Sequence, residues 1–342
     1  MRSQLLEWYA LNRRDLPWRQ NRDPYSIWVS EIMLQQTRVA VVIERYKAFM
    51  ERFPTLTVLA QAPEQEVLAA WSGLGYYRRA RMLHKTAQFV AERFQGILPN
   101  TAEELRMLPG IGVYTAAAIA SISHNEPVAV VDGNVERVLC RLQGWEANKS
   151  TAMRRKVEML AARLVDPENP GNFNQAMMEL GATVCLPRNP QCQSCPIQHD
   201  CTIQGEHKTQ PRPQMVSREV AFALCVRNGT RVGALQRQVL LQQRPAGLTV
   251  MPGLWELPSL IQPEVPEEHL RMTLRHAIMQ VNYYVRIRTV AEEDVKFMTV
   301  DAGERNWVEL GNAAEMALTG LTRKVLTRAH LLPIITPVAQ EK

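Results

Sequence analysis

The stretch TAEELRMLPGIGVYTAAAIASI, residues 101–122, carries the pattern of two short helices joined by a tight turn. Thr101 and Glu104 form the capping box that starts a helix. Gly110 and Gly112 then give a turn whose bare backbone N–H groups, at the start of the second helix, suit a phosphate oxygen. The pattern is similar to a helix-hairpin-helix motif, although an ordinary glycine turn between packed helices would look the same.

The segments around this stretch repeat the helical pattern. Apolar side chains recur at helical spacing in IMLQQTRVAVVIERYKAFMERF, residues 32–53, and in RARMLHKTAQFVAERF, residues 79–94. Prolines and glycines mark the breaks between such segments. We therefore expect residues 1–204 to form an all-α domain.

The chain changes character after this region. Residues 205–217 are polar, contain two prolines and show no period, as is typical of a linker. Beyond them apolar residues alternate with polar ones, which predicts an α+β domain over residues 218–342. The expected strands are residues 219–226, 239–244, 254–260 and 282–290, and the expected helical patches are residues 266–276 and 319–328.

Length and composition set the broad class. A chain of 342 residues is long enough for two domains. It has no apolar run near the ~20 residues of a membrane span, and its N-terminus lacks the order of a signal peptide. The cysteines give no disulfide pattern, so we expect a cytoplasmic protein without a membrane partner. The net charge of +6 fits a nucleic-acid partner without requiring one.

Four cysteines form the densest chemical pattern in the chain. Cys185, Cys192, Cys195 and Cys201 have the spacing C-x6-C-x2-C-x5-C in CLPRNPQCQSCPIQHDC. Thiolates this close along an irregular, proline-broken segment can converge on one metal centre, whereas disulfides usually join distant segments. The first candidate is a [4Fe-4S] cluster, and zinc is the alternative.

Two carboxylates stand in contrasting surroundings. Glu31 lies among apolar residues in SIWVSEIMLQQT, so loss of solvation should raise its pKa and let it donate a proton near neutral pH. Asp132 follows the apolar run PVAVV and precedes GNVERVLCRL, so we expect it to cap a helix and stay ionised. One acid and one anion are what cleavage of a glycosidic bond requires. Taken singly, Glu31 could be a surface glutamate and Asp132 a structural cap.

A further segment, GLGYYRRARM at residues 73–82, places aromatic side chains beside arginines. Tyr76 and Tyr77 precede three arginines, which suits a wedge into a base stack with nearby phosphate contacts. Packed tyrosines with solvated arginines would give the same pattern.

Together these motifs resemble the helix-hairpin-helix DNA glycosylases with an iron-sulfur loop, the superfamily of endonuclease III. The closer similarity is to the adenine DNA glycosylases of the MutY type. It is carried by LPWRQNRDPYSIWVSEIMLQQT, WSGLGYYRRAR, LPGIGVYTAAAIAS, VDGNVERV and NQAMMELGATVC, and it spans nearly the whole chain. The resemblance implies an all-α helix-hairpin-helix glycosylase domain with an iron-sulfur cluster loop at residues 185–201, followed by an α+β Nudix-like domain.

The resemblance also implies an activity. It indicates a monofunctional DNA N-glycosylase of base excision repair, with a [4Fe-4S] cluster as cofactor. Its implied partner is double-stranded DNA with A:8-oxoguanine or A:G mispairs, and we expect a monomer. By resemblance, Glu31 protonates the adenine and later activates water, while Asp132 stabilises or captures the sugar cation. Tyr114 and Asn134 would hold Asp132 and its surroundings.

The same resemblance assigns contacts to DNA. Adenine cannot react inside the duplex and must be flipped out of it. The matching residues are Gln36 and Tyr76 for insertion into the base stack, Trp18, Arg19 and Gln175 for the base pocket, and Gly110 and Gly112 for the phosphate anchor.

Two positions indicate that the protein does not cleave the DNA strand. Relatives that cut the strand carry a sugar-attacking lysine where this chain has Tyr114, and many relatives carry a lysine where it has Glu136. The resemblance therefore implies hydrolysis by water that leaves an abasic site. The alternatives are an endonuclease III-like glycosylase and lyase acting on oxidised pyrimidines, and a lesion-binding protein without catalysis.

The second domain departs from its family at two places. QQRPAGLTVMPGLWELPSL resembles the start of a Nudix box, but Ser259 and Leu260 replace its glycines and no run of paired glutamates follows. We therefore do not expect a nucleotide pyrophosphatase. Ile278, Met279 and Gln280 stand where the family often has a Phe-Ser-His loop that touches 8-oxoguanine. Selection of the oxidised base should be correspondingly weaker.

Overall fold

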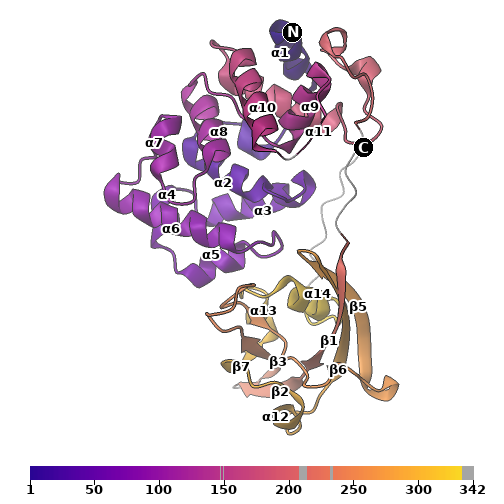
Figure 1. The fold of residues 1–342 in the computed structure, drawn as a ribbon. Helices are drawn as coiled ribbons and strands as arrows, with labels where there is room; N and C mark the ends of the chain where they lie inside the picture. Colours follow the sequence, from indigo (N-terminus) through magenta and orange to yellow (C-terminus); the bar gives the residue numbers. More distant parts are fainter. Residues whose placement is uncertain (147, 149, 208–213, 232–233, 333–342) are drawn as a thin grey trace. The chain divides into compact units, whose positions relative to one another are not determined.

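A computed structural model gives the structure of residues 1–146, 148, 150–207, 214–231 and 234–332 (Figure 1). The chain divides into two compact units. The first comprises Met1–Gln61 and Met82–Pro211, and the second comprises Ala62–Arg81 and Arg212–Lys342. Among the described residues, no helix is both long and apolar enough to cross a membrane.

The helices of residues 1–204 follow the predicted pattern (Figure 1). They are α1 (Arg2–Asn12), α2 (Pro24–Leu34), α3 (Val39–Arg52), α4 (Leu56–Gln61), α5 (Glu64–Ala70), α6 (Arg78–Arg93), α7 (Ala102–Met107), α8 (Val113–His124), α9 (Gly133–Gln143), α10 (Thr151–Leu164) and α11 (Pro170–Thr183). Short 3-10 turns η1 (Pro17–Arg19), η2 (Cys192–Ser194) and η3 (Gln198–Asp200) lie between or after them. The all-α prediction is confirmed for the residues described in this region.

Helices α2 and α8 form the centre of the first unit. Both are buried over almost their whole length, and α7 and α11 also pack against α8. A helix that is apolar on all sides is expected in an interior position. Asp23 starts α2 by accepting a hydrogen bond from the Ser26 backbone at 2.8 Å, and Pro24 occupies the first turn, where its missing N–H costs nothing.

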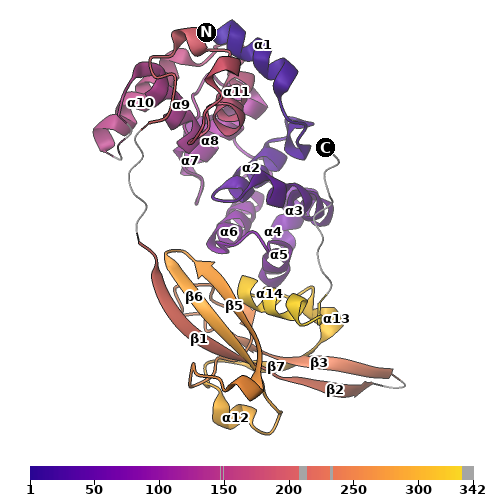
Figure 2. The same ribbon diagram turned by 90° about the vertical axis from the view of Figure 1, so that its right-hand side faces the viewer.

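The second unit contains two sheets (Figure 2). One sheet has the order β1-β6-β5, and in the other β3 pairs with β2, β4 and β7. The strands are β1 (Val216–Leu224), β2 (Val226–Arg231), β3 (Ala234–Gln243), β4 (Trp255–Glu256), β5 (Leu270–Ile278), β6 (Val281–Thr289) and β7 (Arg305–Glu309). The helices are η4 (Glu267–His269), α12 (Val295–Met298), α13 (Leu310–Ala313) and α14 (Gly320–Arg328). The pairing of β1 with β6 is parallel, and the other pairings are antiparallel.

Two expected elements of this unit differ from the prediction. The strand expected over residues 254–260 is limited to β4, Trp255–Glu256. The expected helical patch at residues 266–276 is a single 3-10 turn followed by strand β5. Leu270 and Leu274 are four residues apart, which fits a helix, but the side chains of the segment alternate between more and less exposed positions, as in a strand. The segment forms a strand because it pairs in antiparallel fashion with β6. A local sequence pattern does not predict such a long-range contact.

Residues 62–81 join the second unit, although the sequence interpretation assigned them to the helical domain. The Tyr77 hydroxyl donates to the Leu318 carbonyl at 2.9 Å, and the Arg323 Nε donates to the Ser72 hydroxyl at 2.7 Å. Tyr77 and Ser72 are buried, so these bonds are shielded from water. Helical periodicity within residues 62–81 carries no information about such distant partners.

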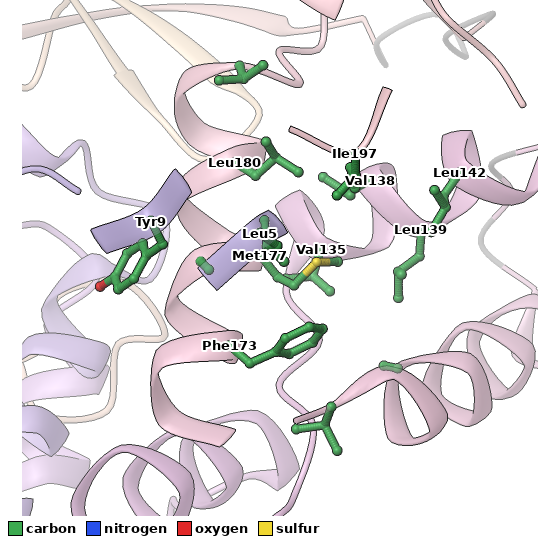
Figure 3. Close-up of a cluster of buried hydrophobic side chains, with 14 of the residues drawn as sticks. Leu5, Tyr9, Val135, Val138, Leu139, Leu142, Phe173, Met177, Leu180 and Ile197 are labelled. Atoms are coloured by element: carbon green, nitrogen blue, oxygen red, sulfur yellow. The ribbon is translucent and has the colours of Figure 1, made fainter. Parts of the chain in front are cut away.

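A hydrophobic core in the first unit supports the cysteine loop (Figure 3). Leu5 from α1, Val138 from α9 and Phe173 from α11 are almost completely buried in it. Ile197 of the cysteine loop enters the same core, and Cys185, Cys195 and Cys201 pack against it. Each such apolar side chain stabilises the fold by roughly 1.5–3 kcal/mol. The loop is therefore anchored by the same burial that holds these helices together.

Candidate active site

A pocket of about 610 Å³ lies in the first unit, among α2, α8, the start of α9, and α11. Its volume is in the range of sites that enclose small ligands. It gathers residues that are far apart in the sequence. Many of them were assigned from the sequence to catalysis, to the base pocket or to insertion into the base stack. These are Trp18, Arg19, Glu31, Gln36, Tyr114, Asp132, Asn134 and Gln175.

Glu31 is a buried acid in this pocket. It is 5% exposed, and its Oε2 accepts a hydrogen bond from the Tyr114 hydroxyl at 2.6 Å. Burial raises the pKa of Glu31 to about 7; the negative charge of Asp132 adds to this, while the Tyr114 hydrogen bond and the positive charge of Arg19 oppose it. The surface-glutamate alternative is wrong, and the carboxyl has the proton affinity of a general acid at neutral pH.

Asp132 caps helix α9, as predicted. Its Oδ1 accepts from the Val135 backbone N–H at 2.7 Å, and its Oδ2 accepts from the Asn134 amide at 3.0 Å. Burial raises the pKa of Asp132 above its ordinary value, while these hydrogen bonds and the charge of Arg137 lower it. Sequence reasoning from the cap alone missed the burial. Asp132 still has more partners for its charged form than Glu31 has, so it is the better anion of the two.

Tyr114 lines the pocket near Asp132, but its hydrogen bond goes to the other carboxylate. Its hydroxyl bonds to Glu31, the first carboxylate, whereas Asn134 does bond to Asp132. Burial raises the pKa of Tyr114 well above its ordinary value, and the charges of Glu31 and Asp132 raise it further. Tyr114 therefore stays protonated and acts as a hydrogen-bond donor to the acid.

The sequence interpretation also missed Glu179. This residue lines the pocket one helical turn after Gln175 on α11, and its carboxylate binds Arg14 and Arg19. The spacing of four residues places Gln175 and Glu179 on one face of the helix. This spacing was the sequence pattern from which Glu179 could have been assigned to the pocket.

Two residues assigned to insertion into the base stack share a backbone feature. The φ angles of Gln36 and Tyr76 are 56° and 45°, in the left-handed region that residues other than glycine rarely adopt. Such conformations cost on the order of 1 kcal/mol and cluster at functional sites. Tyr76 is 49% exposed, with the Arg79 guanidinium 5.5 Å from its ring centre.

The glycine hairpin between α7 and α8 is built as predicted. Gly110 has a φ of 77°, and a Cβ placed on it would lie 2.9 Å from the Met82 side chain, so a larger residue would be both strained and crowded. The Thr86 hydroxyl bonds to the Pro109 carbonyl and ties the hairpin to α6. Gly112 caps α8 and has open space where a side chain would be. The backbone at Gly112 can therefore approach a ligand closely.

Residues 278–280 form the tip of the β5–β6 hairpin in the second unit. Ile278 ends β5 and is half-buried, whereas Met279 is 70% exposed with a φ of 53°. The Gln280 carbonyl accepts from the Val216 N–H at 3.0 Å, which ties the tip to the start of β1. Met279, rather than Ile278, is the outermost apolar side chain of this tip.

The four cysteines line one hollow beside the core, as their spacing predicted. The buried Arg141 guanidinium lies beside them and donates to the Cys185 sulfur at 3.3 Å and to the Leu186 carbonyl at 2.7 Å. A cation there offsets the negative charge of thiolates. In the part of the chain that the structure describes, no three His, Cys, Asp or Glu side chains converge on the position of a single ion. A donor set of four thiols around a hollow fits a cluster in which each thiolate binds its own iron.

A chain of hydrogen bonds joins Asp132 to this loop. Asn134 donates to Asp132, and the Arg137 guanidinium donates to the Asn134 side-chain oxygen at 2.9 Å. Arg137 also donates to the Gly181 carbonyl at 2.7 Å and to the Cys185 carbonyl at 2.9 Å. The position of Asp132 is thus coupled to the first residue of the cysteine loop.

Comparison with known proteins assigns the family. Residues 29–163 match the HhH-GPD superfamily of base excision DNA repair proteins, and residues 185–201 match the iron-sulfur binding domain of endonuclease III. The adenine DNA glycosylase of Mycolicibacterium smegmatis is 45% identical over 199 residues, which cover 57% of this chain and 67% of that protein. The chain belongs to the adenine DNA glycosylase family.

Other members of the adenine DNA glycosylase family extend the match. The human protein is 42% identical over 335 residues, which cover 82% of this chain and 60% of its own length. The chain thus spans less than two thirds of that relative. Among solved structures, a thermostable thymine-DNA glycosylase is 30% identical with a TM-score of 0.55, covering 59% of this chain and 94% of its own. A trapped endonuclease III–DNA covalent intermediate is 26% identical with a TM-score of 0.51, covering 59% and 92%.

The match to the iron-sulfur domain begins and ends on two of the four cysteines, Cys185 and Cys201. Together with family membership and the four-thiol hollow, it identifies the cofactor of this adenine DNA glycosylase family member as a [4Fe-4S] cluster. The zinc alternative is set aside.

Proposed function

We propose that the protein removes adenine from double-stranded DNA in which adenine is mispaired with 8-oxoguanine or guanine. The observation that carries the proposal is that two different carboxyl groups line one pocket: Glu31, a buried acid with a pKa of about 7, and the hydrogen-bonded Asp132. One group donates a proton near neutral pH, and the other stabilises positive charge. We also propose that it acts on this DNA as a monomer.

In this mechanism Glu31 transfers its proton to the adenine ring as the bond between the base and the sugar breaks. The bonding electrons leave with the base, and the positive charge on the sugar develops beside Asp132. Glu31, now ionised, accepts a proton from the water that attacks the sugar, which restores the acid and leaves an abasic site. The Tyr114 hydroxyl, 2.6 Å from Oε2, stabilises the ionised state of Glu31 between the two proton transfers.

The proposed binding mode requires the adenine to be flipped into the pocket. Trp18, Arg19 and Gln175 would contact the base there, because all three line the pocket. The left-handed backbones of Gln36 and Tyr76 support their assignment to insertion into the base stack. Gly110 and Gly112 would hold a phosphate through the backbone of the hairpin.

The protein should release the base without cutting the strand. Tyr114 donates to Glu31 and has no amine with which to attack the sugar, and Glu136 carries the opposite charge to a lysine. We expect duplexes with A:8-oxoguanine and A:G to lose adenine and to break only after alkali, whereas thymine glycol duplexes stay intact. A borohydride-trapped complex as strong as that of a true lyase, or release of thymine glycol, would favour the endonuclease III-like alternative.

We further propose that residues 218–342 form a Nudix-like domain that reads the base opposite the adenine through residues 278–280. The exposed Met279 can press on a base by shape, but the tip lacks the hydroxyl and imidazole of Phe-Ser-His. Replacing residues 278–280 with Phe-Ser-His should raise the preference for A:8-oxoguanine over A:G on the order of tenfold, since one regained hydrogen bond contributes about 1–3 kcal/mol.

This loop exchange is measured as the ratio of single-turnover rates on the two duplexes. The A:G rate is the internal control, because the regained contact needs the oxidised base edge. Deleting residues 218–342 is a poorer experiment, since it would also remove Leu318 and Arg323, the partners of Tyr77 and Ser72. An unchanged ratio in the exchanged protein would show that residues 278–280 do not read the lesion.

A further inference from the structure

Glu179 is a buried carboxylate whose acceptor capacity is filled. It is 1% exposed, and four hydrogen bonds reach its two oxygens. Its Oε1 accepts from the Arg14 backbone at 3.1 Å and from Arg14 Nε at 2.8 Å. Its Oε2 accepts from an Arg14 terminal nitrogen at 2.9 Å and from an Arg19 terminal nitrogen at 2.8 Å. A carboxylate has about four lone-pair sites, so none remains for a bound base.

Glu179 therefore acts on the pocket through the two arginines. Burial opposes ionisation of Glu179, but the hydrogen bonds from Arg14 and Arg19 lower its pKa to about 2. The carboxylate is thus charged at any physiological pH. Arg19 is also held by the Arg14 carbonyl, to which it donates at 3.1 Å, and by the Tyr9 ring, whose centre lies 5.5 Å from its guanidinium. Its side chain is 11% exposed and is fixed on three sides.

We propose that Glu179 is a positioning residue that holds the Arg19 guanidinium in an ion pair on the pocket wall and so prevents it from pairing with the proton donor Glu31. The inference rests on the proposed function only for its catalytic consequence. A free guanidinium in the same pocket would form an ion pair with Glu31 and stabilise the ionised form, which cannot act as an acid.

The charges that face Glu31 from each packed element agree with this role. Tyr114 from α8 donates a hydrogen bond and favours the ionised form, and so does Arg19 from η1 through its charge. Asp132 at the start of α9 favours the protonated form. Arg14 also lines the pocket, but Arg19 is the cation among the groups that act on Glu31, and its hydrogen bond to Glu179 from α11 fixes its guanidinium.

The test is a titration of Glu31 in the full-length holoprotein, followed by 13C NMR of labelled glutamate carboxyls and assigned with Glu31→Gln. In Glu179→Gln the titration midpoint of Glu31 should fall by about one pH unit, because an opposite charge within about 4–6 Å lowers a carboxyl pKa by roughly this much or more. Glu179→Asp keeps the charge but shortens the side chain, so a smaller fall in the Glu31 midpoint is expected. If Glu179→Gln does not fold, the midpoint in Glu179→Asp tests the proposal. Adding Arg19→Met to either variant should cancel the fall.

Two matched outcomes separate positioning from structural support. Glu158→Gln removes an exposed ion pair with Arg154 on α10 and should leave the Glu31 midpoint unchanged. If Glu179→Gln and Glu179→Asp both keep the wild-type midpoint, the proposal is overturned, even if both lose activity. The same holds if the fall persists after Arg19→Met.

Catalysis adds an independent arm. Single-turnover adenine release by Glu179→Gln should fall by about tenfold at pH 8 and much less at pH 6, because the protonated fraction of Glu31 drops about tenfold per pH unit above its midpoint. An equal loss at both pH values would contradict the proposal. If the wild-type protein releases no adenine, the proposed function fails, but the NMR midpoints still decide the role of Glu179.

Discussion

Glu31→Gln is expected to abolish adenine release, lowering the single-turnover rate by about 100-fold or more. The amide keeps the size of the side chain and can still accept a hydrogen bond from Tyr114, but its N–H groups are not acidic enough to transfer a proton to the base. In the wild-type protein the rate should be highest below pH 7 and fall above it, because the active form of Glu31 is the protonated one and its pKa is about 7. The variant should show a low rate without this decline.

Stability distinguishes this loss from unfolding. The fold raises the pKa of Glu31 from 4.5 to about 7, so the folded protein binds this proton more tightly than the unfolded chain does. The contribution of Glu31 to stability therefore declines as pH rises from about 4.5 to about 7 and stays low above that. Glu31→Gln has no charge to bury and should be more stable than wild type at pH 8, by on the order of 1–3 kcal/mol.

A matched control is Glu44→Gln on the neighbouring helix α3, where the carboxylate is 52% exposed. It should change neither the rate nor the stability appreciably. The assignment of Glu31 as the acid would be wrong if Glu31→Gln kept a rate near that of wild type, or if the wild-type rate did not depend on pH between 6 and 8.

Much of the helical unit and its site could be predicted because the decisive patterns are local. The capping box at Thr101, the glycines of the hairpin and the cap at Asp132 each depend on a few consecutive residues. The cysteine spacing is local too, since all four thiols lie within residues 185–201. Such features depend little on how the rest of the chain folds.

The features that the sequence did not reveal depended on long-range partners. Residues 266–276 form a strand because β6 pairs with them, and Tyr114 bonds to Glu31 because α2 packs against α8. Glu179 was not found because Arg14 and Arg19 lie 165 and 160 positions earlier in the chain. Local periodicity cannot show which distant side chain will meet a buried carboxylate.

Asp132→Asn is the second change expected to have a large effect, again about 100-fold or more in single-turnover adenine release. Removing a fixed group that stabilises developing charge typically costs about 100- to 1,000-fold. Asparagine caps helices about as well as aspartate, so the bond to the Val135 N–H can be kept and α9 should remain folded. What is lost is the negative charge beside the sugar.

The chain offers a close control for Asp132→Asn. Asp23 caps α2 by accepting from the Ser26 backbone at 2.8 Å, and it is not among the residues that line the pocket. Asp23→Asn therefore makes the same chemical change at a helix start and should leave adenine release within a few-fold of wild type. Both variants should still bind an A:8-oxoguanine duplex, which gel-shift titration measures. If Asp132→Asn releases adenine as fast as Asp23→Asn does, Asp132 is a structural cap, and the sugar cation must be stabilised by another group in the pocket.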